Sequence, residues 1–143
     1  MTRLATLADV PALVHCAEAF PLQAIEPTAV TPLFEMSITQ GACFLAEDNG
    51  VVTGFIVGLV LPHPFTGTFY VDIIAFWLLP THQTSAAALG LLRKLLRFAD
   101  AEPLPVVKVS APIGSHLGKV LLKLGFEAVE VTYIKGAPWL SRR

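Results

Sequence analysis

The sequence is poor in charge and in cysteine, and it has no hydrophobic run long enough to cross a membrane. Charged side chains make up 15% of the 143 residues, against about 25% in typical soluble domains, while 54% are apolar. This balance excludes a disordered chain and predicts a large buried core in a single domain over residues 1–143. The longest apolar run, residues 51–62, contains Thr53, Gly54 and Gly58 and falls short of the roughly 20 residues of a membrane helix. We therefore expect no membrane partner.

Cysteine usage indicates a reducing environment. Cys16 and Cys43 are the only two cysteines, and they do not form a closely spaced pair. Such sparse usage favours reduced thiols in an intracellular protein over a disulfide framework. Asp9 and Glu18 lie where a secretory signal would have its apolar stretch. These features predict a cytoplasmic protein. The four histidines show no metal-ligand spacing, so no metal site is predicted.

Charge is balanced overall, at −1, but it is unevenly distributed along the chain. Residues 1–72 hold one basic and seven acidic side chains, whereas residues 73–143 hold nine basic and four acidic ones. An anionic ligand is therefore expected on the second half, unless the two halves interleave and the asymmetry averages out in space. A nucleic-acid partner is not expected, because no basic strand interleaved with aromatic residues is present. The high apolar content favours burial of surface against a second copy, as in a homodimer.

Apolar periodicity and turn residues predict an α/β (α+β) fold in the order β-α-α-β-β-β-α-β-α-β. Strands are expected at residues 3–6, 42–47, 51–61, 68–79, 106–111 and 129–134, and helices at residues 10–20, 27–40, 86–99 and 116–124. Asn49-Gly50 predicts a tight hairpin turn, because both positions of such a turn require positive φ. Residues 68–79 are apolar except at Thr68 and Asp72, so this strand is expected to be buried on both faces and central in the sheet.

The junction between this strand and the next helix is the most informative segment. A strand that leads into a capped helix directs unpaired backbone amides and the positive end of the helix dipole at one point, which favours phosphate binding. The side chains there are small or hydroxylated, and the amides are accessible, at Gln83, Thr84, Ser85, Ala86, Ala87 and Ala88. The alternative is that these small residues only help the helix to pack against the sheet.

Several short patterns, taken in order, resemble the GNAT superfamily of acyl-CoA-dependent N-acyltransferases over nearly the whole chain. They are residues 6–13 (TLADVPAL), 44–55 (FLAEDNGVVTGF), 78–83 (LLPTHQ) and 123–126 (KLGF). The family's phosphate loop, Arg/Gln-x-x-Gly-x-Gly/Ala, corresponds here to residues 83–88. Trp77 and the short spacing between helix and strand resemble small phage-encoded members with a degenerate acyl-CoA loop.

The resemblance implies a mixed, mostly antiparallel central sheet of about six to seven strands with about four helices. It implies that the sheet opens after its fourth strand, where the backbone of Leu78 and Leu79 would pair with the pantetheine arm of acetyl-CoA or a related acyl-CoA. The amides of residues 83–88 would then hold the pyrophosphate. The implied reaction is direct transfer of the acyl group to an amine of a small molecule or a protein. The loops that would shape the acceptor groove, residues 21–31 and 61–67, carry no readable motif.

Departures from the family pattern keep a second interpretation open. Leu121 stands where members commonly have a proton-donating Tyr, and Gly114 stands near the usual Asn. Thr84 and Ala86 replace glycines of the loop, and the branched Thr84 crowds the approach of a ligand to the backbone. The chain is therefore either an unusual transferase or a catalytically inactive binding or assembly module with the same fold.

Three polar residues are candidates for catalysis. Asp72 lies in an otherwise apolar strand, where burial would raise its pKa towards that of a useful base, unless it faces solvent at the start of the strand. His116, beside the cap of the last helix, would donate a proton in place of the missing Tyr; the alternative is a surface histidine. Tyr133 is either a proton donor near the acceptor groove or a core aromatic. Arg93, Lys94 and Arg97 favour a solvated helix face over a contact with the 3′-phosphate.

Overall fold

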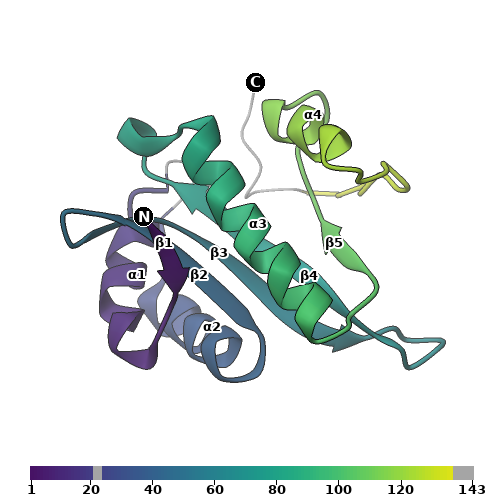
Figure 1. Ribbon diagram of the computed structural model, residues 1–143, viewed down its shortest axis with the longest axis horizontal. Helices are drawn as coiled ribbons and strands as arrows, with labels where there is room; N and C mark the ends of the chain where they lie inside the picture. Colours follow the sequence, from purple (N-terminus) through teal and green to yellow (C-terminus); the bar gives the residue numbers. More distant parts are fainter. Residues whose placement is uncertain (21–23, 137–143) are drawn as a thin grey trace. The chain divides into compact units, whose positions relative to one another are not determined.

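The computed structural model describes residues 1–20 and 24–136, and it divides into two compact units (Figure 1). The first unit is Met1–Val109 and the second is Ser110–Arg143. Each unit is described by itself, and the single domain over the whole chain stays a prediction. Residues 21–23, part of the predicted acceptor segment, lie outside the described residues.

The first unit contains a five-stranded sheet in the order β1-β2-β3-β4-β5. The strands are β1 (Thr2–Leu4), β2 (Ala42–Asp48), β3 (Val51–Pro62), β4 (Phe69–Leu78) and β5 (Val107–Val109). Every neighbouring pair is antiparallel except β4 and β5, which are parallel. The prediction of a mixed, mostly antiparallel sheet is confirmed, although it has fewer strands than expected.

The described residues form four helices, as predicted: α1 (Val10–Ala17), α2 (Pro27–Gln40) and α3 (Ser85–Ala101) in the first unit, and α4 (His116–Lys123) in the second. Short 3₁₀ turns precede α1 and α3, namely η1 (Leu7–Asp9) and η2 (Pro80–His82). Within the described residues, no helix is long and apolar enough to span a bilayer. Between β2 and β3, Asn49 and Gly50 have φ of 51° and 78°, so the predicted hairpin turn is confirmed.

The two faces of the sheet are covered by different helices (Figure 1). Alternate residues of β2 and β3 point to one face and pack with α1 and α2, in a cluster that includes Leu13, Phe34, Cys43, Leu45 and Phe55. The helix α3 packs against β1, β2 and β3 with a row of fully buried leucines: Leu91, Leu92 and Leu95. Each fully buried leucine or phenylalanine stabilises the fold by about 1.5–3 kcal/mol. The strands buried on both faces are therefore β2 and β3.

The prediction that β4 is buried on both faces is wrong. Only Val71, Ile73 and Leu78 of this strand are buried, and β4 lies next to the sheet's edge rather than at its centre. An extra residue, Ile74, interrupts the register, because Val57 pairs with Ala75 and the adjacent Gly58 pairs with Ile73. The mostly apolar run thus belongs to a bulged strand whose two halves have different surroundings, and not to a strand that is covered on both faces.

The predicted strand at residues 129–134 is absent from the described structure, where this segment has no regular secondary structure. Val129 and Tyr133 are 78% and 90% exposed, and Val131 is exposed as well. Alternation of apolar and polar residues indicates which face of a strand would be buried, but a strand forms only where a neighbour supplies its hydrogen bonds. The predicted strand at 106–111 is likewise shorter, covering only Val107–Val109.

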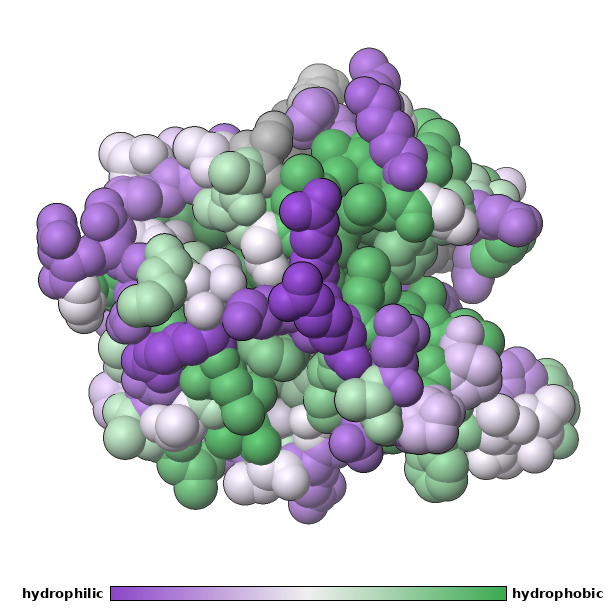
Figure 2. Space-filling view, viewed as in Figure 1, coloured by the Kyte–Doolittle hydropathy of each residue, from purple (hydrophilic) through white to green (hydrophobic). Residues whose placement is uncertain are grey.

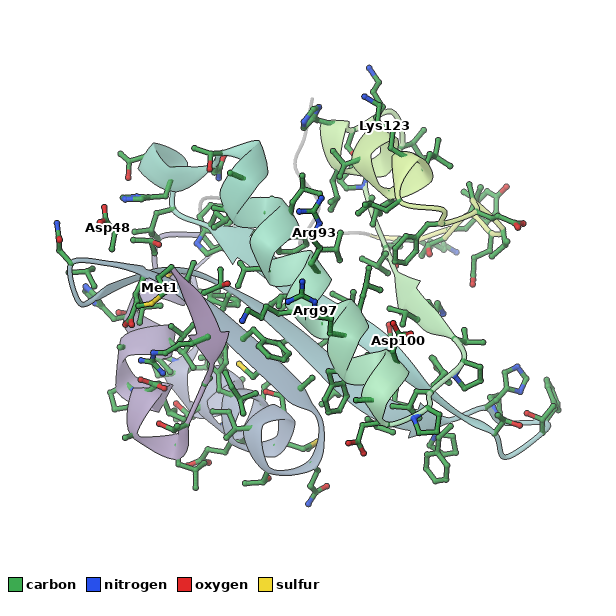
Figure 3. The ribbon with its side chains drawn as sticks, in the orientation of Figure 1. Met1, Asp48, Arg93, Arg97, Asp100 and Lys123 are labelled. Carbon is green, nitrogen blue, oxygen red and sulfur yellow. The ribbon has the colours of Figure 1, made fainter. Side chains whose placement is uncertain are left out.

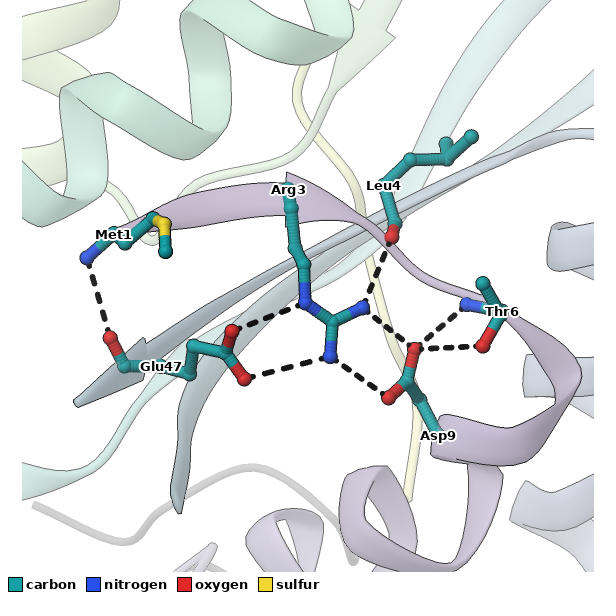
Figure 4. A network of polar contacts seen from close by, with 6 residues as sticks. All are labelled: Met1, Arg3, Leu4, Thr6, Asp9 and Glu47. Atoms are coloured by element: carbon teal, nitrogen blue, oxygen red, sulfur yellow. Dashed lines mark hydrogen bonds and ion pairs between the residues drawn. The ribbon is translucent and has the colours of Figure 1, made fainter. Parts of the chain in front are cut away.

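An ion-pair network fastens β1 to its surroundings (Figure 4). The Arg3 guanidinium donates to both carboxylate oxygens of Asp9 at 2.9 Å and to Glu47 Oε1 at 3.1 Å. Asp9 Oδ2 also accepts from the Thr6 amide at 2.7 Å and from its hydroxyl at 3.1 Å. The hydrogen bonds from Arg3 hold the pKa of Asp9 well below its usual range. The network therefore joins β1, η1 and β2 through one side chain.

Replacement of Asp9 by Asn is expected to reduce the acid sensitivity of the fold. An aspartate whose folded pKa lies below the unfolded value of about 3.9 contributes stability that is complete above about pH 5 and is lost as the pH falls through 4 towards the folded pKa. D9N should lower the melting temperature by a few degrees at pH 7 and by less at pH 3, as measured by circular dichroism. D100N, at an exposed position of α3, is the control. Equal losses at both pH values would contradict this role of Asp9.

Candidate functional site

The second half of β4 has an open edge. Its partner β5 pairs with it only at three positions, where Val71, Asp72 and Ile73 face Val107, Lys108 and Val109. Beyond Ile73 the strand continues to Leu78, while β3 remains paired with it on the other side. Since β5 is the last strand of the sheet order, residues 74–78 have no strand on this second side within residues 1–20 and 24–136. Their outward backbone groups are therefore available to a ligand.

Backbone alternation identifies which residues present those groups. The Leu79 amide donates to the Thr53 carbonyl of β3 at 2.8 Å, so Leu79, Trp77 and Ala75 direct their amides towards β3. Phe76 and Leu78 consequently face the open edge. The Leu78 carbonyl there accepts from Gln83 Nε2 at 2.9 Å. The Leu79 amide, which was predicted to meet the pantetheine arm, is already in use, and the candidate positions become Phe76 and Leu78.

The N-terminus of α3 follows directly after this edge. Thr84 is its N-cap: the Thr84 hydroxyl accepts from the Ala87 amide at 3.2 Å, and its carbonyl accepts from the Ala88 amide at 3.1 Å. The Thr84 amide itself donates to the His82 carbonyl at 2.8 Å. Helix geometry leaves the amides of Ser85 and Ala86 without a partner inside the helix. Of the six amides predicted to bind phosphate, those of Thr84, Ala87 and Ala88 are therefore engaged, and those of Gln83, Ser85 and Ala86 remain as donors within the described structure.

An apolar cavity of about 330 Å³ lies in the first unit, bounded by α1, α2, β3 and β4. The β4 residues Ile74, Ala75, Phe76 and Trp77 belong to its wall, so the cavity adjoins the open half of the strand. The indole Nε1 of Trp77 is buried and has no acceptor in the part of the chain that the structure describes. Ligand sites are typically concave and mostly apolar, with few polar groups, and this cavity fits that description.

The comparisons with known proteins agree with this geometry. The family model of the acetyltransferase (GNAT) family matches residues 12–126. The chain belongs to the GNAT acetyltransferase family. No curated protein matches it in sequence.

Solved structures share the GNAT fold at low sequence identity. A predicted acetyltransferase from Clostridium acetobutylicum, solved with acetyl-CoA, superposes with a TM-score of 0.75 at 19% identity, with 96% of each chain covered. The aminoglycoside 6′-N-acetyltransferase of Acinetobacter haemolyticus gives a TM-score of 0.73 at 15% identity, with 94% of this chain and 97% of that one covered. These likenesses establish the fold of this GNAT member.

Asp72 is the candidate catalytic residue that lies on β4 itself. It is half-buried, and its Cα is registered between Leu59 of β3 and Lys108 of β5. Val71 faces α3, because Val71 and Leu95 both approach Gly58. Alternation therefore points Asp72 and Ile74 to the other face, where the cavity lies. Its place is compatible with a contact to an acceptor bound there.

His116 and Tyr133 lie in the second unit of this GNAT chain. His116 is the first residue of α4 and is exposed, and the preceding Ser115 caps the helix by accepting from the Gly118 amide at 3.1 Å. Tyr133 is exposed in the irregular segment after α4. Leu121, which stands where family members commonly have Tyr, is buried within the unit. Catalytic roles for His116 and Tyr133 stay predictions.

The remaining reactive side chains do not form a site. Burial raises the pKa of the Cys16 and Cys43 thiols to about 11, so both are protonated at neutral pH and are poor nucleophiles. Arg93 and Arg97 are exposed on the outer side of α3, labelled in Figure 3, and hydrophilic atoms cover this ridge in Figure 2. The prediction of a solvated helix face is confirmed there.

Two features near the candidate site were not predicted from the sequence. The first is the cavity, because the bulge at Ile74 that shapes its β4 wall leaves no mark in an apolar run. The second is His82, whose ring contacts Thr81 Oγ1 at 2.8 Å through Nδ1 and Asp48 Oδ2 at 3.2 Å through Nε2. This contact ties η2, which leads into α3, to the β2–β3 hairpin. The one sequence signal for His82 is its position just before the predicted N-terminus of a helix.

Proposed function

We propose that the protein transfers the acetyl group of acetyl-CoA to a primary amine of a small molecule or protein. The observation that carries this proposal is the open edge of β4 at Phe76 and Leu78, followed at once by the N-terminus of α3. This combination offers backbone partners for an extended amide chain and donors for a phosphate group within one stretch of the sequence. Membership of the GNAT family supports the same reaction.

The residues present fit the donor. The outward amides of Phe76 and Leu78 and the Phe76 carbonyl would pair with the amide groups of pantetheine as a neighbouring strand does, while the Leu78 carbonyl accepts from Gln83. The amides of Ser85 and Ala86, at the positive end of the α3 dipole, would hold the pyrophosphate. Ala86 is exposed and carries only a methyl group, so a phosphate can approach the backbone. Structures of GNAT relatives solved with CoA or acetyl-CoA support this choice of donor.

The chemistry requires positioning and two proton transfers. Acetyl-CoA supplies an acetyl thioester. Asp72 would hold the substrate ammonium group and take a proton from it, so that the neutral nitrogen forms a C–N bond with the thioester carbonyl carbon as the C–S bond breaks. The nitrogen then loses a second proton, and the leaving thiolate gains one. Leu121 cannot supply that proton, so His116 is proposed as the donor, with Tyr133 as the second candidate.

A catalytically inactive binding module is the second candidate function. Two observations favour it: Leu121 replaces the usual proton donor, and the Thr84 hydroxyl occupies the Ala87 amide. Such a module would retain the open edge of β4 and bind CoA without turnover.

We further propose that the protein is a cytoplasmic homodimer. The exposed, alternating apolar residues Val129, Val131 and Tyr133 support the burial of this segment against a second copy. Light scattering should give twice the 15.4 kDa of one chain. A mass of one chain at micromolar concentration would contradict the dimer.

Replacement of Ala86 by Asp tests the phosphate site. A carboxylate at this position would repel a pyrophosphate at the helix N-terminus, so A86D should weaken acetyl-CoA binding about tenfold or more in calorimetry. The same carboxylate interacts favourably with the helix dipole, so the melting temperature should not fall. A86N, which has the same size without the charge, is the matched control and should bind more tightly than A86D. Equal affinities for the two variants would contradict the proposed phosphate site.

Thiol release in the presence of amines separates the two candidate functions. The wild-type protein with acetyl-CoA should release CoA thiol when an amine is added, and D72N should slow this release while D100N should not. Acetyl-CoA binding without thiol release across a panel of amines would favour the inactive module.

A further inference from the structure

The cavity beside β4 is lined mainly by apolar side chains. Its lining comes from Phe20 at the end of α1, from Leu33 and Phe34 of α2, from Phe55 of β3 and from the 74–77 segment of β4. Among the described residues that line it, none carries an ionisable side chain. The interior therefore offers dispersion contacts and no counter-charge.

The bulge in β4 creates the floor of this cavity. In a regular strand Val71 and Trp77 would share a face, but Val71 faces α3 and Trp77 contacts Phe20 on the α1 side. The extra residue explains this reversal, since it places Ile74 and Ala75 next to one another on the cavity side. Ile74 is 39% exposed, which is unusual for an isoleucine within a strand and leaves it available to a ligand.

Aromatic rings give the cavity fixed walls. The rings of Phe20 and Trp77 meet edge to face with centroids 5.3 Å apart, and those of Phe34 and Phe55 do so at 5.1 Å. Such pairs hold each other in place and present ring faces and edges to a further ring. The volume of about 330 Å³ is roughly twice that of a 150 Å³ cavity that binds benzene, so one aromatic or branched aliphatic group fits.

The acidic residues on the surrounding elements do not supply charge to the interior. Glu18 contacts His15 at 3.4 Å, Glu26 caps α2 by accepting from Thr28, and Glu35 is exposed. Asp72 is the acidic residue on the cavity side of β4, about 7 Å along the strand from Ile74. A polycation placed in the cavity would lose its hydration without gaining a partner, whereas an amine with one ammonium group can keep it near Asp72.

We propose that the acceptor is a primary amine that carries a single apolar group, an aromatic ring or a branched alkyl chain, on a short linker. This inference rests on the proposed acetyl transfer and specifies its substrate class. The apolar group occupies the cavity between α2 and β4, and the ammonium group lies towards Asp72. The polycationic aminoglycosides named for several structural neighbours do not suit this cavity.

Substrate comparison tests the inference. With acetyl-CoA, kcat/KM for 2-phenylethylamine should exceed that for ethylamine by about tenfold or more, because the ring is buried, and it should also exceed that for kanamycin. Faster transfer to kanamycin or ethylamine would overturn the inference and leave the proposed acetyl transfer intact. Faster transfer from hexanoyl-CoA than from acetyl-CoA, without a preference for 2-phenylethylamine, would assign the cavity to the acyl chain and overturn it as well.

Two matched variants place a negative charge on α2, one in the cavity wall and one outside it. Leu33 is a half-buried lining residue, whereas Met36 on the same helix is 47% exposed and does not line the cavity. L33E should reduce the ratio of kcat/KM for 2-phenylethylamine to that for ethylamine about tenfold, and M36E should leave this ratio unchanged. L33A removes apolar contact without adding charge, so it should reduce the preference for 2-phenylethylamine over ethylamine more mildly. It replaces L33E in this test if L33E does not fold. An unchanged preference in L33A and L33E would overturn the inference.

Binding is measured separately from turnover. Trp77 lines the cavity, and replacing the other tryptophan, Trp139, by Phe makes Trp77 the sole fluorescent reporter. Addition of 2-phenylethylamine should shift Trp77 emission in W139F, and addition of ethylamine should not. This shift without thiol release would support the cavity assignment and contradict acetyl transfer. No shift at millimolar 2-phenylethylamine, in a protein that acetylates other amines, would overturn the cavity assignment alone.

Discussion

Backbone hydrogen bonding along β4 is the constraint on which the candidate site depends. Each strand inside a sheet uses both of its edges, and the first half of β4 does so with β3 and β5. At Ile74 an additional residue enters the strand, and β5 stops pairing one residue earlier. The outward amides of Phe76 and Leu78 and the outward Phe76 carbonyl then lack a strand partner, which is costly unless water or a ligand meets them, whereas the Leu78 carbonyl accepts from Gln83. Because of this bulge, Ile74 and Ala75 both lie on the cavity side of the strand.

The phosphate side of the site shows a competition between stability and binding. Thr84 stabilises α3 by capping it, and in doing so its hydroxyl takes the Ala87 amide that a glycine at this position would leave to a ligand. Gln83 similarly uses its side chain on the Leu78 carbonyl. Both contacts are single hydrogen bonds at the rim of the site, of the kind that a strongly anionic ligand can replace. Thr84 thus forms a hydrogen bond with a backbone amide that a glycine at this position would leave free for a ligand.

Local chemistry made part of this structure predictable. Asn49-Gly50 specified a turn, since few residues adopt positive φ, and Pro27 with the apolar spacing that follows predicted a helix to about Gln40, where α2 ends. The strand-to-helix junction at residues 80–88 was likewise readable, because caps and small side chains act within a few positions. The bulge at Ile74 was not, since it depends on the pairing register between β4 and β3. The alternation at 129–134 predicted a strand wrongly, because pairing partners are not encoded within the segment itself. The availability of the Leu79 amide depended on Thr53, 26 positions away in the sequence.

Hydrogen exchange of the β4 amides, resolved by residue with NMR, tests the central claim most directly. Without ligand, the amides of Phe76 and Leu78 should exchange faster than that of Val57 in the fully paired strand β3. Saturating acetyl-CoA should slow exchange at Phe76 and Leu78 and leave Val57 nearly unchanged. Unchanged exchange at Phe76 and Leu78 under saturating acetyl-CoA would contradict the open edge of β4 as the place where the donor binds.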